Sequence, residues 1–470
     1  MIIKNFLLGV ISLSLLQMSS VLGQIGNKHN APPNIILIVS DDQGYHDLGS
    51  YGNGAIITPH LDRLAAEGVR FTDFYVTSSI CTPSRSGLLT GRYPQRNGTY
   101  ELFRNDRVDE GYQYNEAEYS TTPERILGTD LREVFISEIL KKAGYTNGIF
   151  GKWDLGQLRR FLPLQQGFDR FYGFVNTGID YFTHQRYGIG SMYSDNEPTT
   201  ADKGTYSTDL FTRKALRFLD ENREKPFFLY LPYNAPHSAS SLDPTIRSTV
   251  QAPEETRHLY PMGKTKKENQ TRDYRAAVTR MDESIGDILK RVAQHGLEDN
   301  TLVVFLSDNG GGVGSDNSPL RGRKGQFWEG GIRVPCIIKW PGQIEAGAVN
   351  RDFVTSLELF PTLLAAAGVA HPNDVTLDGF NLLPRLMGGT EKVREEMFWE
   401  LREDQAARVG TWKWVASPKG SGLFNLEKDI GEQYDLTAEQ PEVARKMREK
   451  FAAWQSAMQR AEPRGPFRDY

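Results

Sequence analysis

Cysteine is scarce in this chain. Two of the 470 residues are cysteines, Cys81 and Cys336. A single pair cannot form a disulfide framework, so the fold must depend on the large hydrophobic core that a chain of this length can bury. Cys336 precedes Ile337-Ile338 in an apolar run, which predicts an inert thiol in a buried strand. The surroundings of Cys81 are different and are described below.

Apolar runs of membrane-spanning length are also missing. The apolar run Phe6–Leu16 follows Lys4 and precedes the small residue Gly23. It is too short to cross a bilayer comfortably. This order of charge, apolar run and small residue is typical of a signal peptide. We therefore expect cleavage after residue 23, export to the periplasm or the extracellular space, and no membrane span.

Basic and acidic residues are nearly equal in number, with 55 Lys and Arg against 59 Asp and Glu. The formal net charge is −4, and no dense stripe of Lys and Arg is present, so we expect no nucleic-acid partner. The composition shows neither an internal repeat nor a low-complexity segment. These absences leave an ordinary globular protein.

Continuous apolar runs predict the fold class. Ile35–Val39, Phe227–Leu231 and Leu302–Leu306 are each bounded by Gly, Pro or Asp, as buried strands are. Helical patterns lie between them, over residues 58–68, 133–143 and 275–294. The alternation predicts an α/β fold with a large, mainly parallel sheet and helices on both faces. Ligands of such sheets gather at the carboxyl ends of the strands.

The pattern changes along the chain. Three polar, aromatic-rich segments, 101–125, 176–204 and 238–269, have no clear period. They either shape a substrate pocket or are plain surface insertions. After residue 391 short strand patterns precede a helical pattern over 439–458. We therefore expect three parts: a signal peptide (1–23), a catalytic domain (24–391), and a smaller C-terminal α+β subdomain with a short antiparallel sheet (392–470).

Oxygen-bearing side chains follow two of the predicted strands. Asp41 and Asp42 come after the first strand, and Asp308 and Asn309 follow the strand that ends at Leu306. Each pair alone fits ordinary turn chemistry. Together, at the same edge of a parallel sheet, they favour a hard cation such as Ca²⁺ or Mg²⁺.

Cys81 lies where a helix should begin. Pro83 follows it closely and an apolar pattern comes next, which is typical of a helix N-terminus. Backbone N–H groups at such a position favour an anion, and Arg85 lies one turn away. These features also fit an ordinary reactive thiol.

The motif around Cys81 resembles that of a known family. Cys81-Thr82-Pro83-Ser84-Arg85, followed by Leu89-Thr90-Gly91-Arg92, is similar to the signature of type I sulfatases. The resemblance continues over nearly the whole chain after the signal peptide, in the following blocks: Asn34–Asp42, Thr58–Leu64, Gly151-Lys152-Trp153, Ala235-Pro236-His237, Ser307–Gly311, Pro319–Lys324, Glu329–Pro335 and Leu423–Leu426. It implies the fold of the alkaline-phosphatase-like superfamily.

The resemblance also implies a mechanism. Cys81 would be oxidised to formylglycine (3-oxoalanine), whose hydrate attacks the sulfur of a sulfate ester and later releases sulfate. One Ca²⁺ would be bound by the modified Cys81 together with Asp41, Asp42, Asp308 and Asn309. The remaining roles fall on four residues: Arg85 would hold the formylglycine hydrate, Lys152 and Lys324 would grip the sulfate, and His237 would help to protonate the leaving oxygen.

One position departs from the family pattern. Family members commonly have His after Gly-Lys-Trp, where this chain has Asp154. A carboxylate can accept a proton as an imidazole does, but it adds negative charge beside an anionic substrate. Asp154 is either the working base, or other groups take over this step.

Three readings of the function follow. The first is a sulfatase acting on a sulfated polysaccharide or oligosaccharide, whose partner would be a formylglycine-generating or anaerobic sulfatase-maturating enzyme. The second is a phosphomonoesterase or phosphodiesterase of the same superfamily. The third is a non-catalytic binder of sulfated glycans, with Asp154 as a mark of lost activity. The complete set of sulfate-gripping residues favours the first.

Overall fold

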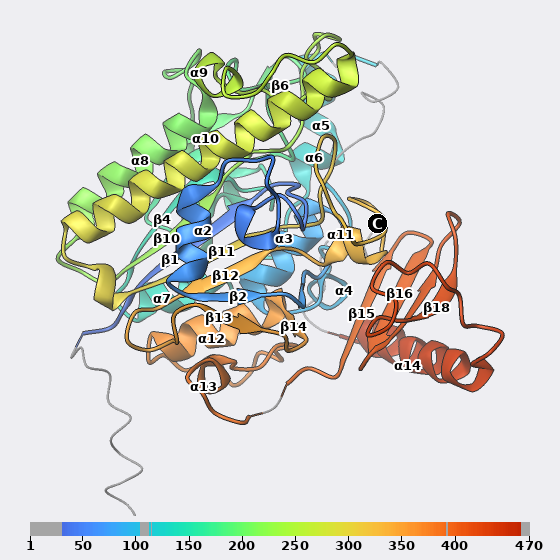
Figure 1. Cartoon of the computed structure of the whole chain (residues 1–470). Coiled ribbons are helices and arrows are strands. Elements are labelled where there is room, and N and C mark those ends of the chain that lie inside the picture. The colour runs from blue at the N-terminus through green and yellow to red at the C-terminus, as the bar shows by residue number, and fades with distance from the viewer. Residues whose placement is uncertain (1–30, 104–111, 114, 392, 462–470) are drawn as a thin grey trace, which may run out of the picture. The chain divides into compact units, whose positions relative to one another are not determined.

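A computed structural model describes residues 31–103, 112–113, 115–391 and 393–461 (Figure 1). The chain is divided after Pro32, and the unit that begins at Pro33 contains every element described below. The predicted signal peptide lies outside the described residues. In the described ranges, no helix combines the length and the apolar character needed to cross a membrane.

A ten-stranded sheet forms the centre of the second unit, in the order β13-β2-β12-β11-β1-β10-β4-β5-β8-β9. Its middle is parallel and consists of β11 (Thr301–Ser307), β1 (Asn34–Ser40), β10 (Phe227–Pro232), β4 (Thr146–Lys152) and β5 (Arg170–Phe174). The outer strands are β12 (Cys336–Lys339), β2 (Val69–Phe71), β13 (Ala348–Asn350), β8 (Met192–Ser194) and β9 (Glu197–Pro198). Antiparallel pairs join β12 to β11 and β8 to β5. The prediction of a large, mainly parallel sheet is confirmed.

The central strand β1 shows why its sequence is continuously apolar. Ile35, Leu37 and Val39 pack in a core with helices α3 (Cys81–Thr90), α7 (Ile136–Lys142) and α12 (Leu359–Ala366). Ile36 and Ile38 point to the opposite face and pack with α2 (Pro59–Ala66), α8 (Ser207–Asn222) and α10 (Lys266–Gln294). Successive residues of a strand face opposite sides, so a sheet covered by helices on both faces needs an apolar residue at every position. Figure 1 shows α8 and α10 side by side over one of these faces.

Two predicted boundaries differ from the structure. Helix α10 begins at Lys266, nine residues before the predicted start, because Thr265 and Glu268 form a capping box there. The first turns of α10 are polar, so a prediction based on apolar residues placed the start of the helix too late. The segment 176–204, predicted to lack a period, contains the short strands β6 (Gln185–Arg186), β7 (Ile189–Gly190), β8 and β9. Strands of two or three residues are too short to show an alternation.

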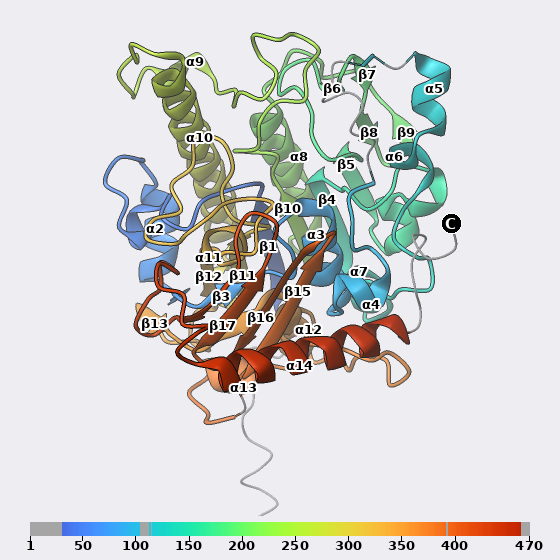
Figure 2. The ribbon, with the colours of Figure 1, turned by 90° about the vertical axis from the view of Figure 1, so that its right-hand side faces the viewer.

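The C-terminal part forms a second, smaller sheet. Its four antiparallel strands are β15 (Glu396–Leu401), β16 (Asp404–Val409), β17 (Trp412–Ala416) and β18 (Gly422–Asn425). Helix α14 (Pro441–Gln459) crosses one face of this sheet (Figure 2). Phe451 and Trp454 of α14 pack on Trp414 and Phe398 of the strands. The predicted α+β architecture with a short antiparallel sheet is confirmed, and the boundary after residue 391 stays a prediction.

A buried ionic network joins this small sheet to the rest of the unit. Lys413 of β17 lies 2.7 Å from Glu329 and 3.1 Å from Glu432. All three side chains are fully buried. Glu432 also accepts a hydrogen bond from the backbone N–H of Glu329, which begins the short helix α11 (Glu329–Ile332). Burial alone would raise the pKa of Glu329, but the cations around it, Lys413 first, hold it at about 2. The network fixes the chain that follows Lys324.

Candidate active site

Three strands deliver polar residues to one edge of the main sheet. Asp41 and Asp42 follow β1, Asp308 and Asn309 follow β11, and Lys152 is the last residue of β4. All five are buried. The pairing of Ser40 with Ser307 sets the ends of β1 and β11 level. The expected convergence of the two oxygen-bearing pairs is therefore present in the fold.

Hydrogen bonds hold the two pairs together. The backbone N–H of Asp42 donates to Asp308 Oδ1 at 3.2 Å, and Asn309 Nδ2 donates to Asp42 Oδ1 at 2.8 Å. Asp42 has φ 68°, in the left-handed region that Asp tolerates better than most residues. This backbone turn directs its carboxylate toward the oxygen cluster.

Three cationic side chains face these carboxylates. Lys152 Nζ lies 2.8 Å from Asp41 Oδ2, and Lys324 Nζ lies 2.7 Å from Asp42 Oδ1. The guanidinium of Arg85, on α3, contacts Asp308 Oδ2 at 2.7 and 2.9 Å. Arg85 and Lys152 are fully buried, as are the carboxylates that they contact. Dense clusters of opposite charges are found preferentially at functional sites.

The cluster shifts the pKa values of its acids in different directions. Burial outweighs the neighbouring cations at Asp41, whose pKa is raised, and at Asp308, whose pKa rises to about 6. Burial opposes ionisation of Asp42 as well, but Lys324 and His237 prevail and lower its pKa. A further positive charge at Asp41 and Asp308 would favour their ionised forms.

Cys81 begins helix α3, as predicted, and its side chain is 2% exposed. Burial, reinforced by the nearby Asp154 carboxylate, raises the pKa of the Cys81 thiol to about 12. The thiolate is the nucleophilic form of cysteine. An unmodified Cys81 is therefore a poor nucleophile at neutral pH, which argues against the reading as an ordinary reactive thiol.

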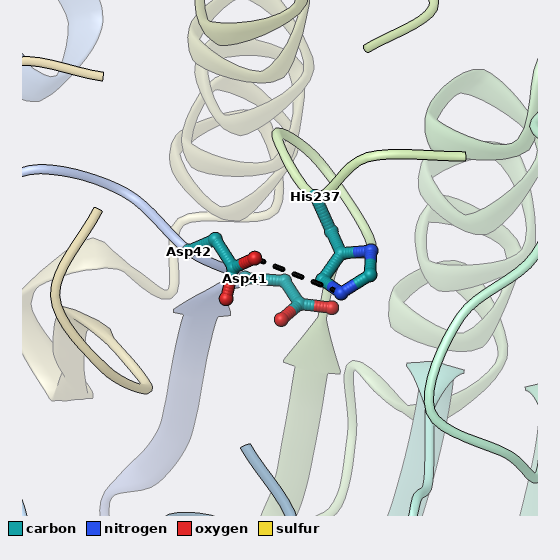
Figure 3. Close-up of side chains that lie close together, drawn as sticks. All are labelled: Asp41, Asp42 and His237. Carbon is teal, nitrogen blue, oxygen red and sulfur yellow. Dashed lines mark ion pairs between the residues drawn. The ribbon is translucent and has the colours of Figure 1, made fainter. Parts of the chain in front are cut away.

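His237, in the loop after β10, faces the same cluster (Figure 3). Its Nε2 lies 3.6 Å from Asp42 Oδ2, and its Nδ1 lies 2.6 Å from the carbonyl oxygen of Ser238. The latter contact assigns the Nδ1 proton in the neutral ring and leaves Nε2 as the acceptor. Burial and the nearby Lys324 lower the pKa of His237 to about 3, against the attraction of Asp42.

Asp154 also lies in the cluster. Its Oδ2 is 3.6 Å from Lys152 Nζ, and its side chain is buried. The residue has φ 59°, again in the left-handed region. Lys152 and Asp154 are thus directed to the same point by the end of β4 and the turn that follows it. All ten residues singled out in the sequence come together in one place.

Several buried oxygens of this cluster make no hydrogen bond to any described residue. They are Asp41 Oδ1, Asn309 Oδ1 and Asp154 Oδ2. A buried polar atom without a partner is costly, and in native proteins it usually meets an ion, a water or a ligand. Asp41, Asp42 and His237 also place ligand atoms within 4.8 Å of one another. The donor set is dominated by carboxylate and amide oxygens, which suit Ca²⁺, whereas a nitrogen ligand does not.

A cavity of about 570 Å³ opens onto Cys81, His237 and Lys324. We call it the catalytic cavity. Residues from all three polar segments line it, among them Leu102, Thr177, Arg186, Ser238 and Arg247. Arg186 and Arg247 both lie over the ring of Tyr187, at 4.8 and 5.3 Å. Sequence reasoning missed these arginines, since no motif marks them in segments without a period.

Comparison with known proteins gives a consistent result. Residues 33–369 match the family model described as sulfatase, and residues 323–457 match the model of the C-terminal region of N-sulphoglucosamine sulphohydrolase. The chain is 35% identical to N-acetylgalactosamine-6-sulfatase of Mus musculus over 427 residues, covering 86% of this chain and 76% of the relative. It is 34% identical to arylsulfatase A of Homo sapiens over 450 residues, covering 86% and 83%.

A solved structure extends the likeness to three dimensions. The crystal structure of Ps i-CgsB in complex with k-i-k-neocarrahexaose superposes with a TM-score of 0.79 at 32% identity, over 93% of this chain and 96% of that chain. The predicted alkaline-phosphatase-like architecture is thereby confirmed. From its sequence, its fold and its relatives, the chain belongs to the sulfatase family, the hydrolases of sulfuric esters.

Proposed function

We propose that this sulfatase removes sulfate from a sulfated polysaccharide or oligosaccharide, with formylglycine made from Cys81 and one bound Ca²⁺. The observation that carries the proposal is the convergence of Cys81, three cations and four oxygen-bearing side chains at one edge of the sheet. The names of the relatives, an N-acetylgalactosamine-6-sulfatase and a protein crystallised with a carrageenan oligosaccharide, support a carbohydrate ester.

The residues fit a hard cation. Asp41, Asp42, Asp308 and Asn309 would hold Ca²⁺ together with the modified residue 81. The buried oxygens Asp41 Oδ1 and Asn309 Oδ1 are available to it, since neither has a hydrogen-bond partner among the described residues. When bound, the cation would acidify a hydroxyl next to it and offset negative charge on the sulfate. His237, a nitrogen donor, is better suited to the substrate than to Ca²⁺.

The residue derived from Cys81 would supply a geminal diol, whose two hydroxyls serve attack on sulfur and later release of sulfate. Arg85 is one turn along α3 from it and would hold this diol in position. Burial raises the pKa of the plain Cys81 thiol, so the unmodified side chain would be mostly protonated and would not itself attack the ester.

The cations would bind the ester itself. Lys152 and Lys324 contact different carboxylates of the cluster, Lys152 that of Asp41 and Lys324 that of Asp42. An ammonium group aimed at the equatorial oxygens of the transferring sulfate stabilises the charge that develops there. Both side chains are held before the substrate arrives, so little reorganisation is needed at the moment of reaction.

Two residues would move protons. Asp154, close to residue 81, would accept a proton from the diol. His237 would donate one from Nε2 to the leaving oxygen, which requires the imidazolium form. The pKa of His237 is low in the protein alone because of burial and Lys324. A bound sulfate would place negative charge beside both groups and raise it.

The test begins with the modification. After expression with a formylglycine-generating or anaerobic sulfatase-maturating enzyme, mass spectrometry of the peptide containing Cys81 should show the aldehyde and its hydrate. Only unmodified cysteine in fully active protein contradicts the proposal. Turnover of an aryl sulfate against the matching aryl phosphate then separates sulfatase from phosphatase, and sulfate release from any sulfated saccharide removes the non-catalytic reading. Export to the periplasm or the extracellular space is part of the proposal and is tested by cell fractionation.

A further inference from the structure

The catalytic cavity continues into two neighbouring cavities. One of about 970 Å³, here the middle cavity, shares Gly312, Val313 and Arg323 with it. Another of about 510 Å³, here the outer cavity, shares Lys267, Thr271 and Arg275 with the middle cavity. The shared lining residues place the three cavities next to one another in a row. They form one track that begins at Cys81 and runs along helix α10.

Cationic side chains line this track beyond the catalytic residues. Arg323 lies where the catalytic and middle cavities meet, and Arg275 and Lys267 lie where the middle and outer cavities meet. Lys267 and Arg323 are exposed, and Arg275 is half-buried. Over the described parts of the chain, none of the three forms an ion pair within 4 Å. Their charge is therefore available to a ligand.

The acids of the middle cavity are already engaged. Asp316 accepts from His46 Nδ1 at 2.9 Å. Asp47 is buried and accepts from the hydroxyl of Tyr274 at 2.5 Å and from the backbone N–H of Gly44 at 2.7 Å. Counted by charge, the lining of the middle cavity holds three cations, Lys267, Arg275 and Arg323, against these two acids. The cavity thus presents net positive charge to whatever enters it.

Neutral groups complete the lining. In the middle cavity the amide of Gln270 and the hydroxyl of Thr271 can bond to sugar hydroxyls. Asn53, Ser315 and Asn317 also line it, but their side chains already bond to backbone groups. Ile56 and the 44%-exposed Val313 offer apolar surface beside them. A small number of polar groups next to apolar contacts is the usual composition of a site for a polyhydroxylated ligand.

We propose that this track binds the sugar units that flank the scissile sulfate in a polyanionic glycan chain. The inference rests on the proposed function and deepens it. The ester occupies the catalytic cavity, the chain crosses Val313, and its next anionic groups meet Arg323, then Arg275 and Lys267. Lys267 and Arg275 are eight residues apart on α10, about 12 Å along its axis. At this spacing the two cations can each meet a different anionic group of one chain, so the track favours an oligomer with several anionic groups over a monosaccharide with one.

The experiment compares ligands of two lengths on matched variants. The double variant Lys267→Gln/Arg275→Gln removes two charges from the track. Lys290→Gln is the control, because Lys290 is an exposed cation of the same helix that lines none of the three cavities. Binding of carrageenan and chondroitin sulfate hexasaccharides, and of the corresponding sulfated monosaccharides, is measured by calorimetry at several salt concentrations.

We expect at least one hexasaccharide to bind the wild-type protein about tenfold more tightly than its monosaccharide, which corresponds to about 1.4 kcal/mol. The double variant should lose most of that gain and have a shallower salt dependence, whereas the control should keep both. In kinetics the loss should appear in KM for the hexasaccharide, so that the ratio of its kcat/KM to that of an aryl sulfate falls.

Three results overturn the inference: no hexasaccharide gains over its monosaccharide, the gain survives in the double variant, or the double variant weakens both lengths equally. If single-stranded DNA displaces the hexasaccharide as well as another hexasaccharide does, the track attracts any polyanion. That result also contradicts the inference. The proposed function has its own test: it is wrong if the matured protein releases sulfate from no ester. That result would not change the outcome of the binding measurements.

Discussion

Lys152 Nζ and Asp41 Oδ2 form a 2.8 Å ion pair in which both side chains are fully buried. The pair leaves Asp41 Oδ1 without a hydrogen bond among the described residues. Two charges out of water need good geometry to offset their desolvation. An oxygen left over at such a pair is therefore well placed to bind a second cation.

The first prediction concerns that cation. Ca²⁺ added to the chelator-treated protein should raise the melting temperature and restore turnover, because a ligand that binds only the folded state stabilises it. The Asp41→Asn variant should lose the Ca²⁺-dependent shift, since the amide cannot supply the charge. Differential scanning calorimetry measures the shift, and Asp316→Asn, outside the cluster, is the control. Full activity of protein shown to be metal-free would contradict the assignment.

The second prediction concerns Asp154. Asn tolerates the left-handed backbone of this position, so Asp154→Asn should fold normally and remove only the basicity. If Asp154 accepts a proton from the diol, turnover should fall by about two to four orders of magnitude. Asp154→His should recover part of it. A variant within about threefold of wild type across the pH range would reduce Asp154 to a residue that orients Lys152.

The third prediction uses the leaving group to test His237. An alkoxide from a sugar needs protonation as it departs, whereas a nitrophenolate does not. His237→Gln should thus slow hydrolysis of a carbohydrate sulfate by about 10²- to 10³-fold and that of nitrophenyl sulfate much less. Steady-state kinetics with both esters provides the comparison. Equal losses on the two substrates would mean that His237 binds the sulfate and donates no proton.

The fourth prediction concerns the buried network of the C-terminal sheet. Lys413→Met leaves Glu329 and Glu432 without their shared cation. The loss of one partner from a buried ionic group costs about 3 to 5 kcal/mol. Denaturant unfolding should show this loss. The added change Glu432→Gln should recover part of it, because Glu432 then has no cation, whereas Glu329 keeps Arg333 at 3.2 Å. No recovery would show that Lys413 acts mainly through packing.

The fifth prediction is a pH dependence of stability at Asp282. Its carboxylate accepts from the backbone N–H groups of Leu61 and His60 at 2.7 and 3.1 Å, at the start of α2. Burial outweighs these donors and raises the pKa of Asp282 to about 6, above the ordinary value of about 3.9. The folded state thus favours the protonated form. Its contribution to stability is complete below about pH 4 and is lost as the pH rises through 6.

Asp282→Asn cannot ionise, so it should not show this loss. Relative to the variant, the wild-type free energy of unfolding should fall by about 2 kcal/mol between pH 4 and pH 7. The control is Asp287→Asn, at an exposed position of α10, the helix that also carries Asp282. A difference that stays constant with pH would mean that Asp282 is ionised throughout this range.

The sequence predicted the parts of the molecule that depend on a single physical requirement. Strand β1 had to be apolar at every position because helices cover both faces, and Asp41 had to lie at its end. Cys81 opens a helix because Ile80 ends an extended segment and Pro83 suits the first turn. These local rules located the sheet edge and, with the family resemblance, the residues around it.

Other features could not be predicted because they depend on contacts between distant segments. Arg186 and Arg247 reach the catalytic cavity only through the fold of two segments without a period. The pairing of Lys413 with Glu329 joins residues 84 positions apart. The low pKa of His237 arises mainly from its burial, which the sequence does not show. The cavity track along α10 likewise depends on how the loop around Val313 lies beside that helix.

The ionic network of the C-terminal sheet has a consequence for the order in which the protein matures. A ribosome makes Lys324 and Glu329 well before Lys413 and Glu432. During that interval the carboxylate of Glu329 lacks the ammonium of Lys413, and the backbone N–H of Glu329 lacks the Glu432 carboxylate to which it later donates. Helix α11, which follows the loop bearing Lys324, therefore gains these two contacts only after the C-terminal sheet has been made. A polypeptide truncated before β17 would carry every predicted catalytic residue but would lack the buried cation that holds the chain beyond Lys324.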